Sequence, residues 1–579
     1  MSVGNNGALE ELIEPLNRVL RHIKQILQLI YSKEEAERIL LKLKKVMDFY
    51  RQDRIISQKR REYEHRDLLS EKDAILITYA NTIYHEEEKP LVTLRRFLNH
   101  YVKDAVTGIH LLPFFPSSSD GGYAVVDYKK VDPELGTWED VKELARDYRL
   151  TVDLVLNHVS SKSEWFQGFL KGDRRYSNYF IWSDKKQARA EVFRPRETPL
   201  FTNFDTAHGR RWVWTTFGAD QIDLNYRNPD VLLSIVDVML FYLSQGAGII
   251  RLDAVGYVWK EPRTSCVNLS KTHQIVRFLR SVLEYVAPYA LILTEANFPY
   301  RENIAYFGER HEAQMVYRFS LPPLVMDAFS RRDTSYIKKI TNRKRQDLLF
   351  FDFLASHDGI ALLAAKEIMS EEAFEGLLKL TTLHGGLVSS RSTESGEQPY
   401  ELNISYFDAI NDPRAPDDPF RVERFMASQA IMLTLKGVPG VYVHSLLGSQ
   451  NNLSGVKETG ISRMINREKL QAGRLDSSLT DGRSLRHRVL WNFLHLLNVR
   501  KQIRAFHPSG TRQVLDSDRR LLIIARGFRG ENIRVVINVS EDRLPLLEYR
   551  GLRELLTGKP FDGMVDSYGV YFLPGMSHG

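Results

Sequence analysis

Eight short runs of β-branched and aromatic residues, separated by longer stretches with helical periodicity, constrain the fold of this 579-residue chain more than any other feature. They are Ala74–Tyr79, Gly108–Pro113, Thr151–Asn157, Ala247–Asp253, Ala290–Glu295, Met315–Phe319, Leu349–His357 and Val438–Tyr442. Strands that alternate with helices are typical of α/β folds with a parallel sheet. Because a closed (β/α)₈ TIM barrel needs eight such strands, we expect that fold here.

The chain is much longer than the roughly 250 residues of a typical barrel, so we expect additional segments. Residues 1–70 are predicted to form a helical extension, because apolar residues such as Ile39, Leu43 and Val46 recur at helical spacing. We expect these helices to pack on the main domain or on a partner chain. The tail, residues 509–579, alternates strand-like runs with turns and predicts a small antiparallel β domain.

Two connections within the predicted barrel domain, residues 71–508, are too long for ordinary βα loops. One insertion covers about 158–226 and is rich in aromatic and charged residues, and the other covers about 359–408. Long connections in compact domains are usually functional or form small domains of their own.

Composition excludes several classes of protein. The net charge is +7, but Lys and Arg are spread along the chain, which argues against nucleic-acid binding. No apolar run is long enough to span a membrane. The single cysteine, Cys266, allows no intrachain disulfide, and the first residues do not have the pattern of a secretory signal. These features predict a cytoplasmic protein without nucleic-acid or membrane partners, and they leave a homo-oligomer possible.

Polar residues end four of the predicted strands, where barrel enzymes place their reactive groups. They are Asn157 and His158, then Arg251 and Asp253, then Glu295, and finally His357 and Asp358. Arg251 and Asp253 are two residues apart, so their side chains leave the strand on the same side. One such residue alone would fit a helix cap or an ion pair. Together, three carboxylates, two histidines and an arginine predict acid/base chemistry at the barrel mouth.

Metal and nucleotide sites find little support in the motifs. The histidines lack HExxH or similar ligand spacing, and GxGxxG and GxxxxGK[ST] are both absent. We therefore expect no metal and no cofactor.

The same strand ends carry a family resemblance. DLVLNHVS, GIIRLDAVGY, LILTEANFP and LASHDG resemble the four sequence regions of the α-amylase superfamily, glycoside hydrolase family 13, and HLLPFFPSSSDGGYAVVDYKKVDPELGTWED resembles its second-strand segment. RLDAVGYVWKEPRTSC, FSLPPL, WTTFGADQIDLNY and GVPGVYVHSLLGSQNN are closer to the sucrose phosphorylase branch. The resemblance runs from about residue 74 to 505. Within that branch, the helical extension, RENIAYFGERHEAQMVYRFSLPPLV and PYELN resemble glucosylglycerate phosphorylases.

The resemblance implies a retaining double displacement with Asp253 as nucleophile and Glu295 as acid/base. Retaining enzymes hold these two carboxyl groups roughly 5–5.5 Å apart. Glu295 must start protonated, so we expect a raised pKa, whereas Asp253 must stay ionised. Arg251 is placed to favour the ionised form of Asp253, because a nearby positive charge lowers a carboxylate pKa. Asp358 would bind hydroxyl groups of the same glucosyl ring.

Further positions match substrate contacts of the resembling enzymes. His158 and His357 would favour the distorted, positively charged sugar ring together with Asp358. Asp120 and Arg467 match positions that hold the far hydroxyls of the glucosyl unit. Tyr123 and Phe217 are candidate aromatic platforms, although plain packing would explain them equally well. Asn157 matches a position that serves calcium in many amylases, but phosphorylases of this branch generally do without that metal.

The acceptor side is predicted from two segments. FRPRETPLF offers Arg194 and Arg196 where sucrose phosphorylases carry a similar RPR segment, and Arg196 is our candidate phosphate contact. A surface ion pair is the alternative for that arginine. Tyr400 and Glu401 lie in a segment that resembles the acceptor loop. Typical sucrose phosphorylases carry glutamine where Glu401 stands, which favours an acceptor other than fructose, with glycerate the first choice.

The leading hypothesis is therefore an α-glucoside phosphorylase, a glycosyltransferase whose substrates are an α-glucoside and inorganic phosphate and whose product is α-D-glucose 1-phosphate. A hydrolase or transglucosidase of the same superfamily is the first alternative. The second, from another class, is an inactive carbohydrate-binding relative, against which the intact Asp253, Glu295 and Asp358 argue.

Overall fold

The computed structural model describes residues 5–63, 68–185, 187, 189, 191–343, 348–393 and 396–575. Side chains are described from residue 14 onward within these ranges, except those of residues 392 and 393. None of the described helices combines the length and the apolarity that crossing a bilayer requires.

Eight parallel strands close into a barrel in the order β1–β17–β13–β12–β11–β10–β4–β3. Their bounds are β1 Ile75–Thr78, β3 Gly108–Leu111, β4 Arg149–Val155, β10 Ala247–Asp253, β11 Leu291–Thr294, β12 Met315–Tyr317, β13 Phe350–Phe353 and β17 Gly437–Tyr442. Each strand overlaps one of the eight predicted runs, so the predicted TIM barrel is confirmed. All seven residues of β10 are buried, as expected for a strand covered on both faces.

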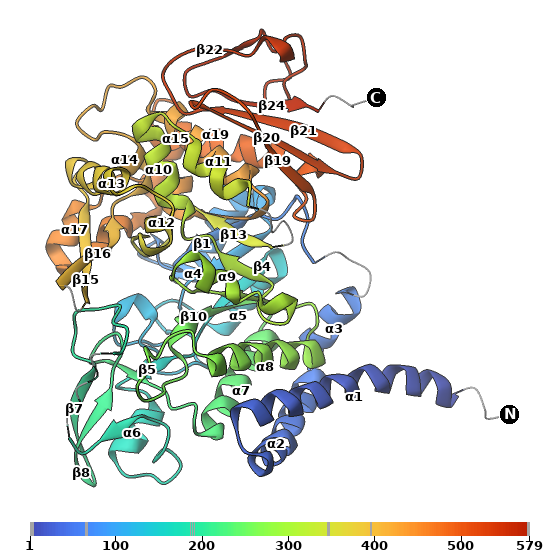
Figure 1. Cartoon of the computed structure of the whole chain (residues 1–579), viewed down its shortest axis with the longest axis vertical. Helices are drawn as coiled ribbons and strands as arrows, with labels where there is room; N and C mark the ends of the chain where they lie inside the picture. The colour runs from blue at the N-terminus through green and yellow to red at the C-terminus, as the bar shows by residue number, and fades with distance from the viewer. Residues whose placement is uncertain are drawn as a thin grey trace.

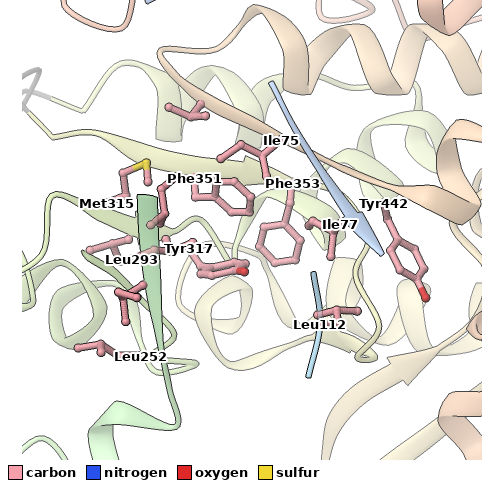
Figure 2. Close-up of a cluster of buried hydrophobic side chains, with 14 of the residues drawn as sticks. Ile75, Ile77, Leu112, Leu252, Leu293, Met315, Tyr317, Phe351, Phe353 and Tyr442 are labelled. Atoms are coloured by element: carbon pink, nitrogen blue, oxygen red, sulfur yellow. The ribbon is translucent and has the colours of Figure 1, made fainter. Parts of the chain in front are cut away.

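Helices surround this barrel, and several of them pack directly on its strands or on one another (Figure 1). They include α4 Pro90–Phe97, α5 Trp138–Asp147, α7 Pro229–Ser244, α8 Ser270–Val286, α10 Leu321–Arg331, α15 Arg421–Thr434 and α19 Leu485–Arg500. Buried apolar side chains from several barrel strands gather in one cluster (Figure 2), among them Ile75 and Ile77 of β1 and Phe351 and Phe353 of β13. Residues two apart in a strand point the same way, so each strand contributes alternate side chains. This packed interior gives the strand ends a rigid base.

Three N-terminal helices lie against α7 and α8 (Figure 1): α1 Asn5–Ile30, α2 Lys33–Arg51 and α3 Arg54–Tyr63. Helix α2 begins at a capping box, in which Ser32 and Glu35 each bond the other's backbone N–H. Ile39 and Leu43 are buried, and Val46 packs at the edge of the same core. The helical spacing in the sequence therefore marks the face that packs on the barrel.

The two long insertions carry small sheets of their own. The first holds β5 His158–Ser160 paired with β9 Gln221–Asp223, helix α6 Glu164–Leu170, and the sheet of β6 Trp182–Ser183, β8 Gly209–Trp214 and β7 Phe201–Thr206. The second holds β14 Ile360–Ala361, β16 Gly396–Asn403, β15 Leu387–Thr393, and helices α12 Leu363–Lys366, α13 Glu371–Leu383 and α14 Tyr406–Ile410. Both insertions lie on the same side of the barrel in Figure 1. They are therefore placed to frame one site between them.

The tail forms the predicted antiparallel sheet, with strands β19 Thr511–Leu515, β20 Leu521–Phe528, β21 Glu531–Asn538 and β24 Val570–Pro574. Arg526 of β20 is fully buried and reaches the end of helix α15, where it donates to the carbonyls of Thr434 at 2.9 Å and Leu435 at 2.8 Å. Arg500 donates to the neighbouring carbonyl of Leu433 at 2.7 Å. Two guanidinium groups thus satisfy the last carbonyls of a buried helix and join the tail to the barrel.

Candidate active site

A pocket lies at the carboxyl ends of the barrel strands and encloses about 760 Å³, open solvent at its mouth included. Most of the residues predicted from sequence line it, namely Asp120, Tyr123, His158, Arg196, Phe217, Asp253, Glu295, His357, Asp358, Tyr400 and Glu401. The two others lie directly behind it, where Arg251 contacts Asp253 and Arg467 contacts the backbone of His357. The structure therefore brings all the predicted residues to one place.

Asp253 and Glu295 stand side by side at the ends of two paired strands. Leu252 of β10 lies opposite Thr294 of β11. The residues that follow them, Asp253 and Glu295, are therefore neighbours across the strand pair. Glu295 donates its N–H to the carbonyl of Leu252 at 3.1 Å, and its carboxylate accepts the N–H of Ala254 at 2.9 Å. Ala254 has a left-handed backbone with φ of 48°, which is unusual for a residue other than glycine. This turn aims its N–H at Glu295 and holds that carboxyl beside Asp253.

A buried chain of charged groups supports Asp253 from below. Arg251 donates to Asp253 at 3.0 Å and, with the same nitrogen, to Asp153 of β4, which lies opposite Arg251 across the strand pair. Asp153 in turn lies 2.7 Å from the Nε2 atom of His110 in β3. Asp153 and His110 were missed by the sequence reasoning. Their signal was available, because both are ionisable residues inside runs that were otherwise predicted to be buried strands.

The pKa values of the two strand-end carboxyls follow mainly from burial. Burial raises the pKa of Glu295, and the nearby charge of Asp358 raises it further, as predicted for an acid. Burial also raises the pKa of Asp253 well above its ordinary value, although Arg251 acts in the predicted direction and lowers it. Arg251 therefore favours the ionised form of Asp253, as predicted, but burial has the larger effect on this pKa. Arg251 shares its charge with Asp153, and the carboxyl of Glu295 adds repulsion.

Arg463 is a pocket residue that the sequence reasoning did not select. It lies on the short helix η6 Ser462–Asn466 and bonds the two oxygens of Glu401 at 3.0 and 2.8 Å. A third bond, of 2.5 Å, joins it to Asp358. Burial raises the pKa of Asp358, but the positive charges around it, Arg463 first and Arg467 among them, outweigh burial and hold that pKa well below its usual range. Arg463 lowers the pKa of buried Glu401 in the same way, so both carboxylates are ionised and already paired.

Another part of the pocket, apart from Asp253 and Glu295, is built around Asp120. Gln221 of β9 donates to Asp120 at 3.1 Å and lies 3.1 Å from the Nε2 atom of His158. Next to Asp120, Gly121 has φ of 60°, and a Cβ atom there would lie 2.6 Å from Arg467. Glycine at this position therefore lets the Arg467 guanidinium approach the same part of the pocket.

Aromatic rings and neutral histidines form the walls. The ring of Tyr123 stacks on that of His357, with centroids 5.1 Å apart and planes 8° from parallel. The ring of Phe217 packs on that of His158, with centroids 5.2 Å apart. Each of the two candidate aromatic platforms therefore contacts a histidine, and each also lines the pocket. Burial lowers the pKa of His158, and it lowers that of His357 to about 3. Both histidines are therefore neutral hydrogen-bonding groups at neutral pH.

Asn157 takes part in a buried cluster beside the pocket. The Nζ atom of Lys260 lies 2.6 Å from Asn157 Oδ1 and 2.6 Å from Asp223 Oδ2. Asp223 also accepts the N–H of Thr216 at 2.7 Å. An ammonium group thus neutralises the oxygens that this cluster presents. Among the described residues, no three or more His, Cys, Asp or Glu side chains are grouped to hold a metal ion.

The acceptor-side residues divide into paired and unpaired groups. Arg194 donates to the carbonyl of Thr198 and does not line the pocket. Arg196 lines the pocket and makes no hydrogen bond or ion pair within the part of the chain that the structure describes. Tyr400 also lines it, and its hydroxyl accepts a bond from Asn297 at 3.2 Å. The surface ion pair considered as an alternative for Arg196 is absent among these residues.

A closed parallel barrel with Asp253, Glu295 and Asp358 at one mouth defines the class of the protein as a barrel enzyme with acid/base chemistry at its strand ends. The family model described as "Alpha amylase, catalytic domain" matches residues 99–360. A glucosylglycerate phosphorylase of Spirochaeta thermophila is 45% identical over 533 residues, which cover 91% of this chain and 90% of the relative. Another, of Allomeiothermus silvanus, is 46% identical and covers 86% and 90%.

Among solved structures, a sucrose 6F-phosphate phosphorylase from Thermoanaerobacter thermosaccharolyticum superimposes with a TM-score of 0.71 at 27% identity, covering 81% of this chain and 94% of that one. The chain therefore belongs to the α-amylase superfamily, glycoside hydrolase family 13, and within it to the glucoside phosphorylases related to sucrose phosphorylase. It is a glycosyltransferase by the class of its family.

Proposed function

We propose that this enzyme transfers a glucosyl unit from α-glucosylglycerate to inorganic phosphate with retention, releasing glycerate and α-D-glucose 1-phosphate. The observation that carries the proposal is the placement of Asp253 and Glu295 in one pocket with Arg196, a cation that makes no ion pair among the described residues. The relatives named glucosylglycerate phosphorylase, at 45% and 46% identity, support the choice of substrate.

In the first step, a carboxylate oxygen of Asp253 attacks the anomeric carbon as the bond to the glycerate oxygen breaks. Glu295 donates its proton to that leaving oxygen, and a covalent glucosyl-enzyme forms. In the second step, a phosphate oxygen attacks the same carbon from the side that glycerate left, and Asp253 departs as a carboxylate. Glu295, now ionised, accepts the proton of the attacking phosphate. Two inversions give net retention.

The protonation of Asp253 and Glu295 fits these two reaction steps. Burial raises the pKa values of the neighbouring Asp253 and Glu295, and the charge of Glu295 raises that of Asp253 further, so a proton held by Glu295 favours the ionised form of Asp253. Arg251 holds the oxygen of Asp253 by a charge-assisted bond, which favours placing the proton on Glu295. The growing positive charge on the sugar would complete the ionisation of Asp253.

The remaining pocket residues would bind the glucosyl unit. Asp358, kept ionised by Arg463, would bind ring hydroxyls, and the neutral His158 and His357 would donate or accept hydrogen bonds. Asp120 and Arg467 would hold the far hydroxyls.

Aromatic and acceptor-loop residues complete the site. Tyr123 and Phe217 would pack on the apolar faces of the sugar. Arg196 would contact phosphate. Tyr400 and Glu401 would shape the acceptor side, where the charge of Glu401 is already matched by Arg463.

The test is to incubate the protein with α-glucosylglycerate with and without phosphate and to follow glucose, glucose 1-phosphate and glycerate. We expect glucose 1-phosphate of the α configuration in equal amount to glycerate, and only slow glucose release without phosphate. Glucose release that ignores phosphate would instead identify a hydrolase. In the synthetic direction, glycerate, glycerol, fructose and fructose 6-phosphate are offered separately with glucose 1-phosphate. A strong preference for fructose would overturn the choice of glycerate.

The raised pKa of Glu295 predicts the alkaline limb of the pH profile. Above that pKa the leaving glycerate oxygen receives no proton, so kcat/KM should fall as pH rises, and the acid limb should report protonation of the pair. A donor that leaves without a proton, such as α-D-glucosyl fluoride, removes the need for the acid. For that donor the alkaline limb of the glucosylation step should be lost in wild type and in Glu295→Gln. If the limb persists in Glu295→Gln, Glu295 is not the acid.

We also propose that the enzyme works in the cytoplasm. The one cysteine, Cys266, is buried and unpaired, as is common in a reducing compartment. A charged sugar phosphate is retained behind a membrane, which suits a phosphorylase there.

A further inference from the structure

A second arginine from the other insertion approaches the same pocket wall as Arg196. The guanidinium carbon of Arg391, in β15, lies 4.7 Å from the centroid of the Phe193 ring. Phe193 packs on Phe298 at 5.6 Å and on Tyr257 at 6.3 Å, and both of these residues line the pocket. Tilted aromatic rings in contact thus link Arg391 to two residues that line the pocket.

Arg196, which lines the pocket, and Arg391, which lies behind its aromatic wall, differ from Arg463 and Arg251 in having no bonded carboxylate partner among the described residues. Arg463 bonds Glu401 and Asp358, and Arg251 bonds Asp253. Within the described ranges, neither Arg196 nor Arg391 makes an ion pair, and the buried Nε atom of Arg391 has no hydrogen-bond acceptor. A buried donor without a partner costs free energy, and an oxyanion bound beside Arg391 would supply the missing acceptor.

The charges of both arginines act at the pocket. Burial raises the pKa of the Tyr257 hydroxyl, and the carboxylate of Glu295 raises it further, while Arg196 and Arg391 both lower it. Both cations therefore lie close enough to the Tyr257 hydroxyl to act on its pKa, in the direction opposite to that of Glu295. Arg196 also lowers the pKa of Glu401, but among the described residues only Arg463 bonds that carboxylate, so the donors of Arg196 remain available to a substrate.

We propose that Arg196 and Arg391 form a two-armed oxyanion clamp on the acceptor side, which binds phosphate in one half-reaction and the carboxylate of the organic acceptor in the other. The clamp deepens the proposed function and rests on it. Phosphate and carboxylate both present two or more oxygens that fit the fork of a guanidinium. Since a double displacement releases one acceptor before it binds the next, one clamp serves both. The enzyme would thereby select acceptors that carry an oxyanion.

The test compares Arg391→Gln and Arg391→Lys with wild type and with Arg210→Gln. Arg210 is an exposed arginine of the first insertion that pairs with Asp205, so it is a matched control. We expect Arg391→Gln to raise the KM for phosphate and the KM for glycerate by about 10- to 100-fold each. The KM for glycerol, a neutral acceptor, should change less than about threefold. The KM values of Arg391→Lys for both anions should lie between those of wild type and Arg391→Gln, because lysine keeps the charge but lacks the forked donors of a guanidinium.

Two further measurements separate the clamp from the proposed function. Hydrolysis of α-D-glucosyl fluoride needs no oxyanion, so Arg391→Gln should lower its rate far less than it lowers the phosphate-dependent reaction. Sulfate, an unreactive oxyanion, should inhibit that hydrolysis, with an inhibition constant about 10-fold higher or more in Arg391→Gln. This readout works even if wild type forms no glucose 1-phosphate, a result that would defeat the proposed function alone.

Several results would overturn the clamp. Unchanged KM values for both anions would show that Arg391 binds neither, and an effect on phosphate without one on glycerate would refute a shared site. An equal rise in the KM for glycerol, or a matching loss of glucosyl fluoride hydrolysis, would show that Arg391 only supports the pocket wall.

Discussion

Replacing Asp253 with asparagine is expected to lower kcat for phosphorolysis at least about 10⁴-fold, because an amide oxygen does not form the glucosyl-enzyme. Asparagine has nearly the same shape and still accepts the bond from Arg251, whose charge remains matched by Asp153. Folding should therefore be kept while chemistry is lost. Release of glucose 1-phosphate measures the activity, and circular dichroism with a urea titration checks the fold. Asp205→Asn, at an exposed carboxylate of the first insertion, is the matched control.

A smaller side chain at the same position gives a sharper test of the nucleophile's location. In Asp253→Ala, azide would occupy the space of the carboxylate and attack the anomeric carbon directly, with glucosyl fluoride as donor. A single inversion would then yield β-glucosyl azide. Activity near the wild-type value in either variant would refute the role of Asp253, and an azide product of α configuration would place the nucleophile elsewhere.

The largest expected effect on stability belongs to Arg526→Met. Arg526 donates to the carbonyls of Thr434, Leu435, His507 and Thr511, which join the end of α15 to the tail sheet. Methionine fills the space and leaves these buried acceptors without donors, which should cost about 3–5 kcal/mol. Loss of the repulsion from Arg500 and Arg512 offsets part of this, since burial together with those two charges lowers the pKa of Arg526 to about 9.

Urea unfolding, followed by tryptophan fluorescence, measures the change, and the midpoint should fall clearly below that of wild type. The control is Arg519→Met, at an exposed arginine two residues before the start of β20. A midpoint equal to that of the control would show that the Arg526 bonds contribute nothing net. The chemistry should be little affected in the folded protein, because Arg526 lies at the far end of the strands from the pocket.

Much of the fold was predictable because burial leaves a local periodic trace. The run Ala247–Asp253 was identified as a strand from its β-branched residues, and it forms β10 with the same bounds. Ile39 and Leu43 marked the packed face of α2 by helical spacing alone. The strand-end residues were predictable for a related reason: parallel barrel strands all deliver their carboxyl ends to one mouth. Asp253 and Glu295 therefore meet whatever the loops between them do.

The same reasoning could not find Arg463, because its significance lies in contacts with Glu401, 62 residues away, and Asp358, 105 residues away. It predicted the direction in which Arg251 moves the pKa of Asp253, but not the larger and opposite effect of burial. Repeating patterns in the sequence determined which segments form the barrel and which carboxylates reach its mouth. Only the tertiary structure decided which of the described arginines make ion pairs and how burial and neighbouring charges together shift the pKa of each carboxyl. Those outcomes depend on distances between remote segments and on the exclusion of water, and neither leaves a periodic trace along the chain.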